Sequence, residues 1–242
     1  MICASERTEG EPTDINGTTR VGDIAARIPA SIDVFERYGV DFCCNGDRPL
    51  TEALAGTGAL VRDVMAEIDD AVDLEREEER QYVDWIHESP ATLADHIVET
   101  HHTFLEREMP RVDRDLAKVI SAHGAHHPEL IELGRVYGQL QAELEDHLRK
   151  EEEQVFPLLR GLGPNDAASP ELLGLLEQLE AEHDGAGSAL HAIRGITSNY
   201  QTPPDACFTY STLYRELQAL ETDIHRHVHL ENNVLIPGLR AR

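Results

Sequence analysis

Lysine is almost absent from this 242-residue chain: Lys118 and Lys150 are the only two, and the 21 basic residues face 46 acidic ones. The formal net charge of −25 argues against nucleic acid or an anionic membrane surface as a partner, because binding phosphate groups requires clustered cations. A surface this acidic, with arginine as nearly its only base, suggests a high-salt cytoplasm in which salt screens like charges.

Aromatic residues are also scarce, at 5%, whereas Ala, Leu and Glu are abundant, which favours helix over sheet. No apolar run approaches the roughly 20 residues of a membrane span, and no charged-then-apolar leader opens the chain. Four cysteines are too few and too irregularly placed for a disulfide scaffold. We therefore expect an all-α, soluble protein of the reducing cytoplasm.

Composition and periodicity divide the chain into four parts. Residues 1–18 are polar and aperiodic, which predicts a flexible tail. Residues 19–70 carry short helical stripes interrupted by glycine and proline, typical of a small helical domain. Residues 71–88 are dominated by acids and predict a solvated linker, and residues 89–242 contain the long amphipathic segments.

Four long segments of residues 89–242 repeat apolar residues with helical spacing. The expected helices are 90–123, 129–159, 170–197 and 207–235. The connections between them are roughly five to ten residues long, so consecutive helices should be antiparallel neighbours. The pattern predicts an up-down-up-down four-helix bundle preceded by a small helical N-terminal module.

Two short segments of this bundle pair a histidine with a glutamate four residues later, at His147 and Glu151 and at His227 and Glu231. On a helix this spacing stacks an imidazole and a carboxylate on one face. His102 and His183 lie at matching distances from the expected turns, so they should face these pairs at one height. The resulting candidate metal ligands are His102, His147, Glu151, His183, His227 and Glu231.

The remaining histidines fit this expected cluster less well. His101 competes with His102, because adjacent positions point about 100° apart on a helix. His123 would lie roughly 31 Å from His102 along a continuous helix, too far for a shared ion. A buried polar network without metal would carry a large desolvation cost. Candidate groups for orienting the imidazoles are Asp146, Glu152, Asp184 and Asp223.

Four imidazoles and two carboxylates form a nitrogen-rich site for two ions. Such a ligand set suits iron and does not exclude manganese or zinc. The ferritin-like pattern is Glu-x-x-His with additional glutamates, whereas here the order is His-x-x-x-Glu and histidine dominates. A ferritin-type oxidase is therefore disfavoured.

The turn-rich segment from Tyr38 to Leu50 contains two adjacent cysteines, Cys43 and Cys44. Proximity to helix termini and to Arg48 would favour a reactive thiolate pair, which makes these two residues candidate catalytic groups. The alternative is that both are small buried hydrophobic residues. The spacing alone does not separate the two interpretations.

Several motifs together resemble a known family, the hemerythrin-like di-iron proteins that repair iron-sulfur centres. The resemblance covers nearly all of residues 20–240. It is carried by YGVDFCC at 38–44, ELEDHLRKEEEQVFP at 143–157, EHD at 182–184 and HLENNVL at 229–235. Asn45 departs from the commonest pattern, in which a second glycine often follows the cysteines.

The resemblance implies a cytoplasmic protein with two iron ions in a non-haem, oxo-bridged di-iron centre held by the six candidate ligands. It also implies a homodimer and, as partners, iron-sulfur proteins damaged by nitric oxide or peroxide. On this interpretation the chain donates iron, and Cys43 and Cys44 contact the client or modulate the centre. Two alternatives stay open: a module that binds or senses oxygen or nitric oxide, and a nitric oxide reductase.

Overall fold

The computed structural model describes residues 15–77, 83–163 and 166–241, and the remainder of the expected tail and linker lies outside these ranges. Helices account for all the regular elements in this part of the chain; pairing of extended backbone is limited to one isolated bridge between Arg20 and Pro49. The predicted all-α class is therefore confirmed. None of the described helices is long and apolar enough to cross a membrane.

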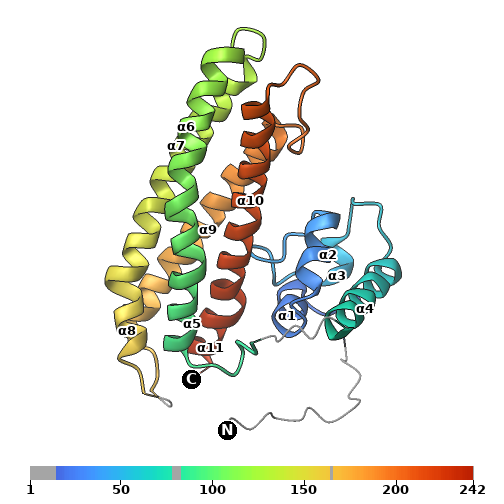
Figure 1. Cartoon of the computed structure of the whole chain (residues 1–242). Coiled ribbons are helices and arrows are strands. Elements are labelled where there is room, and N and C mark those ends of the chain that lie inside the picture. The colour runs from blue at the N-terminus through green and yellow to red at the C-terminus, as the bar shows by residue number, and fades with distance from the viewer. Residues whose placement is uncertain (1–14, 78–82, 164–165, 242) are drawn as a thin grey trace.

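Four long antiparallel helices form the bundle, as predicted (Figure 1). Three of them change from α-helix to a five-residue π-helical segment and back. The first comprises α5 (Pro90–Ile97), η1 (Val98–His102) and α6 (Thr103–His123). The second comprises α7 (Glu129–Lys150), η2 (Glu151–Val155) and α8 (Phe156–Arg160). The third is α9 (Pro170–Ile196), and the fourth comprises α10 (Phe208–Leu230), η3 (Glu231–Leu235) and α11 (Ile236–Arg240).

Local sequence explains where these helices begin. The Oγ atoms of Ser89 and Ser169 accept hydrogen bonds from the backbone N–H groups of Thr92 and Leu172, and a proline follows each serine. A serine cap satisfies a free N–H, and proline suits the first helical position, where its own missing N–H is not needed. The fourth helix runs to Arg240, beyond the expected end at residue 235, because Pro237 stands in the first turn of α11.

The interior of the bundle contains two apolar clusters separated by a polar layer. The lower cluster in Figure 1 lies around α5, α8 and α11 and includes Leu93, Phe156 and Ile236. The upper cluster fills the rest of the bundle. On the first helix, His102 falls between Ile97 of the lower cluster and Leu105 of the upper one. Apolar packing above and below therefore shields the polar layer from solvent at both ends of the bundle.

The small module contains α1 (Val21–Arg27), α2 (Ser31–Tyr38), α3 (Leu50–Ala53) and α4 (Val61–Glu77), and it packs beside α10 (Figure 1). Its buried side chains, such as Phe35 and Phe42, belong to the same apolar cluster as the upper bundle. Arg226 of α10 adds an ion pair to Asp33 at 2.6 Å. Helix α4 continues to Glu77, into the range expected as linker. Ahead of α1, the backbone carbonyl of Gly17 accepts a hydrogen bond from the N–H of Thr51.

Candidate metal centre

Each π-helical segment carries one of the predicted ligands at its junction with the α-helix: His102 ends η1, Glu151 begins η2 and Glu231 begins η3. A π-turn inserts one extra residue, and such insertions are frequent at functional sites because they re-aim a side chain. The sequence prediction assumed uninterrupted α-helices and missed all three. A signal was present, since Pro157 and Pro237 each stand six residues after the glutamate, and proline disrupts the α-helical hydrogen bond of the preceding turn.

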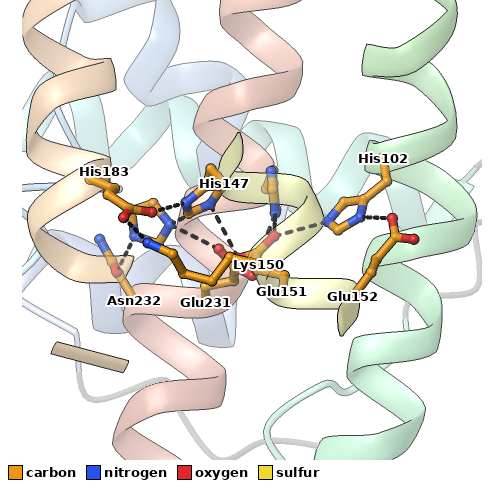
Figure 2. A network of polar contacts seen from close by, with 10 residues as sticks. His102, His147, Lys150, Glu151, Glu152, His183, Glu231 and Asn232 are labelled. Atoms are coloured by element: carbon orange, nitrogen blue, oxygen red, sulfur yellow. Dashed lines mark hydrogen bonds and ion pairs between the residues drawn. The ribbon is translucent and has the colours of Figure 1, made fainter. Parts of the chain in front are cut away.

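Glu151 lies among three of the predicted imidazoles. Its Oε2 atom is 3.1 Å from Nε2 of His102 and 3.7 Å from Nε2 of His227, and its Oε1 atom is 3.1 Å from Nε2 of His147. These side chains come from the first, second and fourth long helices (Figure 2). The carboxylate is fully buried, so the structure brings two oxygens and three ring nitrogens together out of water.

Glu231 occupies the equivalent position on the other side of the site. Its Oε2 atom is 3.0 Å from Nε2 of His183, and its Oε1 atom is 3.4 Å from Nε2 of His227. His183 also approaches His147, with 3.2 Å between their Nε2 atoms. The structure therefore brings all six predicted residues into one buried cluster, and the most exposed of them, His147, is only 4% exposed.

The cluster has more polar atoms than hydrogen bonds. Among the described residues, neither oxygen of Glu151 or Glu231 has a hydrogen-bond partner of good geometry, nor has Nε2 of His102 or His227. Buried polar atoms are normally satisfied, so a group of orphans at one point indicates a missing partner. Ligand atoms of His147, Glu151, His227 and Glu231 all lie within 4.8 Å of one another. These residues fit metal cations.

Acidic side chains at the edge of the cluster contact the Nδ1 atoms of two imidazoles. Nδ1 of His102 is 2.7 Å from Oε1 of Glu152 (Figure 2). Nδ1 of His147 is 2.9 Å from Oε2 of Glu182. The hydrogen bond from His147, together with one from Lys150, lowers the pKa of Glu182 to about 2. An Nδ1–H group that donates to a carboxylate leaves the Nε2 lone pair free for a metal.

A neutral amide performs this task for His183, whose Nδ1 atom is 2.8 Å from Oδ1 of Asn232. Nδ1 of His227 is buried and has no partner in the described part of the chain. Sequence reasoning missed Glu182 and Asn232 as orienting groups. Each stands next in the chain to a candidate ligand, which is the signal that could have identified it.

Of the four acids expected to orient the imidazoles, only Glu152 does so. The carboxylate of Asp223 contacts Nδ1 of His101 at 3.0 Å, Asp146 pairs with Arg149 on the surface, and Asp184 is exposed. The contacts of Asp223 and Asp146 are therefore with other residues than the six clustered ones.

Charge within the cluster is balanced by protons when no metal is bound. Burial alone would lower the pKa of His147, but the carboxylates of Glu151 and Glu182 raise it to about 10. Burial alone would raise the pKa of Glu151, but His147 and the other imidazoles hold it well below its ordinary value. A metal ion that binds to these nitrogens must displace the protons.

Other histidines are placed differently. His101 is buried, but it pairs with Asp223, and its ring stacks on that of His227 at 5.7 Å without approaching either glutamate. His123 is at the end of α6 and contacts the ring of Tyr210 at 5.3 Å, at the opposite end of the bundle from α11. The geometry favours His102 over His101 and keeps His123 out of the cluster.

The double-cysteine loop lies against α9, beside the cluster. Cys43 is 3% exposed, Cys44 is half-buried, and their Sγ atoms are 3.8 Å apart. The Sγ atom of Cys44 is 3.6 Å from the backbone oxygen of His183. The hydrogen bond to Cys44, with burial, raises the pKa of the Cys43 thiol well above its ordinary value. The raised pKa favours the buried-thiol interpretation for Cys43, and Arg48 donates to the carbonyl of Glu52. The catalytic role of the two cysteines stays a prediction.

Comparison with known proteins accounts for both parts of the chain. Residues 93–239 match the hemerythrin HHE cation binding domain, and residues 17–72 match a domain of unknown function named ScdA_N. The iron-sulfur cluster repair protein ScdA of Staphylococcus haemolyticus is 32% identical over 222 residues, which are 91% of this chain and 97% of that protein. The chain belongs to the family of iron-sulfur cluster repair proteins.

Further members of this repair family align over the same extent. The iron-sulfur cluster repair protein YtfE of Citrobacter koseri is 31% identical over 223 residues, 91% of this chain and 96% of that protein. YtfE of Escherichia coli O17:K52:H18 is 32% identical over the same number of residues and the same shares. The buried cluster thus lies in a cation-binding domain, and the resemblance to the repair family is confirmed.

Proposed function

We propose that this chain holds two iron ions and repairs iron-sulfur clusters damaged by nitrosative or oxidative stress by donating iron to them. The observation that carries the proposal is the buried cluster of six side chains with unpartnered carboxylate oxygens, inside a cation-binding domain. The names of the relatives supply the repair activity. When bound, the iron would supply both the cargo for a damaged cluster and open positions for small ligands.

Six side chains would hold the iron: His102, His147, Glu151, His183, His227 and Glu231. Glu151 and Glu231 are suited to bridging because each carboxylate lies between imidazoles of different helices. The orienting groups fix the ring tautomers, so little rearrangement is needed when a metal binds. All six side chains come from one chain, and a homodimer would add no ligand to the site.

Release of iron is favoured by a surface pocket of about 550 Å³ that reaches His147, His183 and His227. Glu143 and Glu182 line this pocket, and carboxylates provide oxygen contacts for a departing cation. We place the activity in the cytoplasm, where Cys43 and Cys44 would stay reduced as the free thiols seen here.

A reconstitution assay tests donation. An enzyme whose iron-sulfur cluster has been damaged by nitric oxide is incubated with the iron-loaded chain, with the metal-free chain, or with an equal amount of free ferrous iron. We expect faster recovery with the iron-loaded chain than with free iron, and a matching loss of iron from the donor. Equal recovery in all three mixtures would overturn the proposal.

The two cysteines distinguish donation from the alternatives. A pocket that reaches three of the imidazoles also admits oxygen or nitric oxide, which favours a binding or sensing module as the second candidate. We expect Cys43→Ser with Cys44→Ser to abolish thiol-dependent iron transfer and to leave reversible gas binding intact in stopped-flow absorbance. Nitrous oxide released over many turnovers would instead identify a nitric oxide reductase.

A further inference from the structure

The residues that follow the two buried glutamates occupy matching positions but differ in chemistry. Glu152 follows Glu151, and Asn232 follows Glu231. Each reaches from its π-helical segment to Nδ1 of an imidazole on a neighbouring helix. Glu152 is 41% exposed and binds its histidine at the surface, whereas Asn232 points towards the small module. An amide, unlike a carboxylate, carries a hydrogen-bond donor as well as an acceptor.

Asn232 makes two hydrogen bonds that only an amide can combine. Its Oδ1 atom accepts from Nδ1–H of His183 at 2.8 Å, and its Nδ2 atom donates to the backbone carbonyl of Cys43 at 3.3 Å. The second bond fixes which end of the amide carries oxygen, because a carbonyl can only accept. The Cys43 carbonyl thereby also determines that His183 carries its proton on Nδ1 and presents Nε2 to the cluster.

We propose that Asn232 is a positioning residue that couples the cysteine loop, residues 41–46, to occupancy of the metal centre through His183. The inference rests on the proposed ligation of iron by His183. A cation on Nε2 makes the Nδ1–H group a stronger donor, which polarises the amide and strengthens its bond to Cys43. The loop is therefore held more tightly when iron is bound than after iron leaves.

Release of the loop would expose the thiols at the moment of donation. Cys44 now packs against α9, with its Sγ atom 3.6 Å from the carbonyl of His183 and 3.2 Å from where a Cβ on Gly187 would stand. Loosening the Cys43 carbonyl weakens this contact, so we expect both thiols to react faster in the iron-free protein. Iron-loaded protein keeps them covered.

The neighbouring residue separates this coupling from simple docking of the module. Nδ2 of Asn233 donates to the carbonyls of Phe42 and Cys43, each at 3.1 Å, but Asn233 does not contact His183. Its Nδ2 atom instead lies 3.3 Å from Nδ1 of His229, which is outside the cluster. Asn233→Ala is therefore the matched control, because it weakens the same loop without touching a candidate ligand.

The test measures alkylation of the two thiols by iodoacetamide in full-length protein with Cys3→Ser and Cys207→Ser. In the parent we expect iron-loaded protein to react about 10-fold more slowly than iron-free protein, the lower end of what an outer-shell hydrogen bond contributes. Asn232→Ala should bring this ratio close to one and weaken iron binding by about 10–100-fold. Asn233→Ala should speed alkylation in both forms and keep the ratio.

A further variant isolates the two halves of the amide. Asn232→Asp keeps an acceptor for His183 but loses the donor to Cys43, so we expect iron affinity to survive while the iron-dependent ratio of alkylation is lost. The iron absorption spectrum of each variant shows whether iron is bound before alkylation is measured. An unchanged ratio in both Asn232 variants at full iron occupancy would overturn the coupling. If the parent shows the expected ratio of alkylation rates but donates no iron in the reconstitution assay, only the proposed repair function is overturned.

Discussion

The segments 147–157 and 227–237 are two versions of one device: a histidine, a glutamate four residues later and a proline six residues after that. Both switch to a π-helical turn at the glutamate. They differ in what surrounds them. The first is backed by carboxylates that reach solvent, with Glu152 41% and Glu182 37% exposed. The second is covered by the small module, its Asn232 offers a neutral amide to His183, and Nδ1 of its own His227 has no partner among the described residues.

This difference teaches that the two halves of the centre are not equivalent. A carboxylate behind an imidazole makes the ring a more electron-rich ligand than an amide does. The surface pocket borders both segments, through His147 and His227, so it does not separate them. We infer that the first side depends on its solvent-reaching carboxylates, and that the second side reports occupancy to the cysteine loop.

Removal of either buried glutamate should have the largest effect. Glu151→Ala or Glu231→Ala deletes two oxygens from the cluster, and we expect at least one of the two irons to be lost, with more than about 100-fold weaker binding of the other, exceeding the effect of outer-shell changes. Metal analysis of each purified variant gives the stoichiometry. Two irons retained in either variant would contradict a bridging role for that carboxylate.

Loss of an orienting carboxylate comes next. Glu182→Ala leaves the Nδ1–H group of His147 unpaired and Lys150 without its partner, so we expect iron binding about 10–100-fold weaker in competition with a chelator. Glu153→Ala is the control, because Glu153 is exposed in the same π-helical segment. Equal affinities for the two variants would mean that the first half does not depend on its outer carboxylates.

The contact between the module and the second half can be broken at a glycine. A Cβ at Gly46 would collide with Oδ1 of Asn233 and lie 2.7 Å from the carbonyl of Phe42. Gly46→Ala should therefore destabilise the protein by about 1–3 kcal/mol in urea unfolding, as overpacking does.

The control for that glycine is Gly185 in α9, where a Cβ would meet no described atom within 4 Å. Gly185→Ala should raise stability by up to about 1 kcal/mol, because alanine is the better helix former. A stable Gly46→Ala protein would show that the close approach of the loop to Asn233 is not required.

A half-buried imidazole, His127, lies between carboxylates at the upper end of the bundle and should give the smallest effect. The hydrogen bond to Asp205, then that to Glu129, raises the pKa of His127 above its ordinary value of 6.5. A raised pKa in the folded state stabilises the protein below pH 6.5, and the contribution disappears as pH rises through the raised value. The melting temperature of His127→Gln should fall below that of the parent at pH 5.5 and equal it at pH 9.

The sequence was sufficient to predict the four long helices and the common height of the clustered histidines, because hydrophobic periodicity and loop position determine both. It did not reveal the π-helical turns, because Pro157 and Pro237 are equally well interpreted as marking the ends of uninterrupted α-helices. Nor did it reveal Glu182 or Asn232, whose roles depend on facing side chains of other helices. Which of the two interpretations of Cys43 and Cys44 applies also depends on such contacts, and Arg48 donates to the backbone carbonyl of Glu52.

The polar layer between the two apolar clusters also governs how the bundle opens. Side chains around Phe156 and Ile236 meet the rest of the interior across charged groups instead of continuous hydrocarbon. The lower end is therefore a separate cooperative unit, whose fluctuations require less free energy than global unfolding. Amide hydrogens in α8 and α11 should exchange faster than those in the middle of α6 and α7. Each such opening would expose the lower side of the six-residue cluster to solvent.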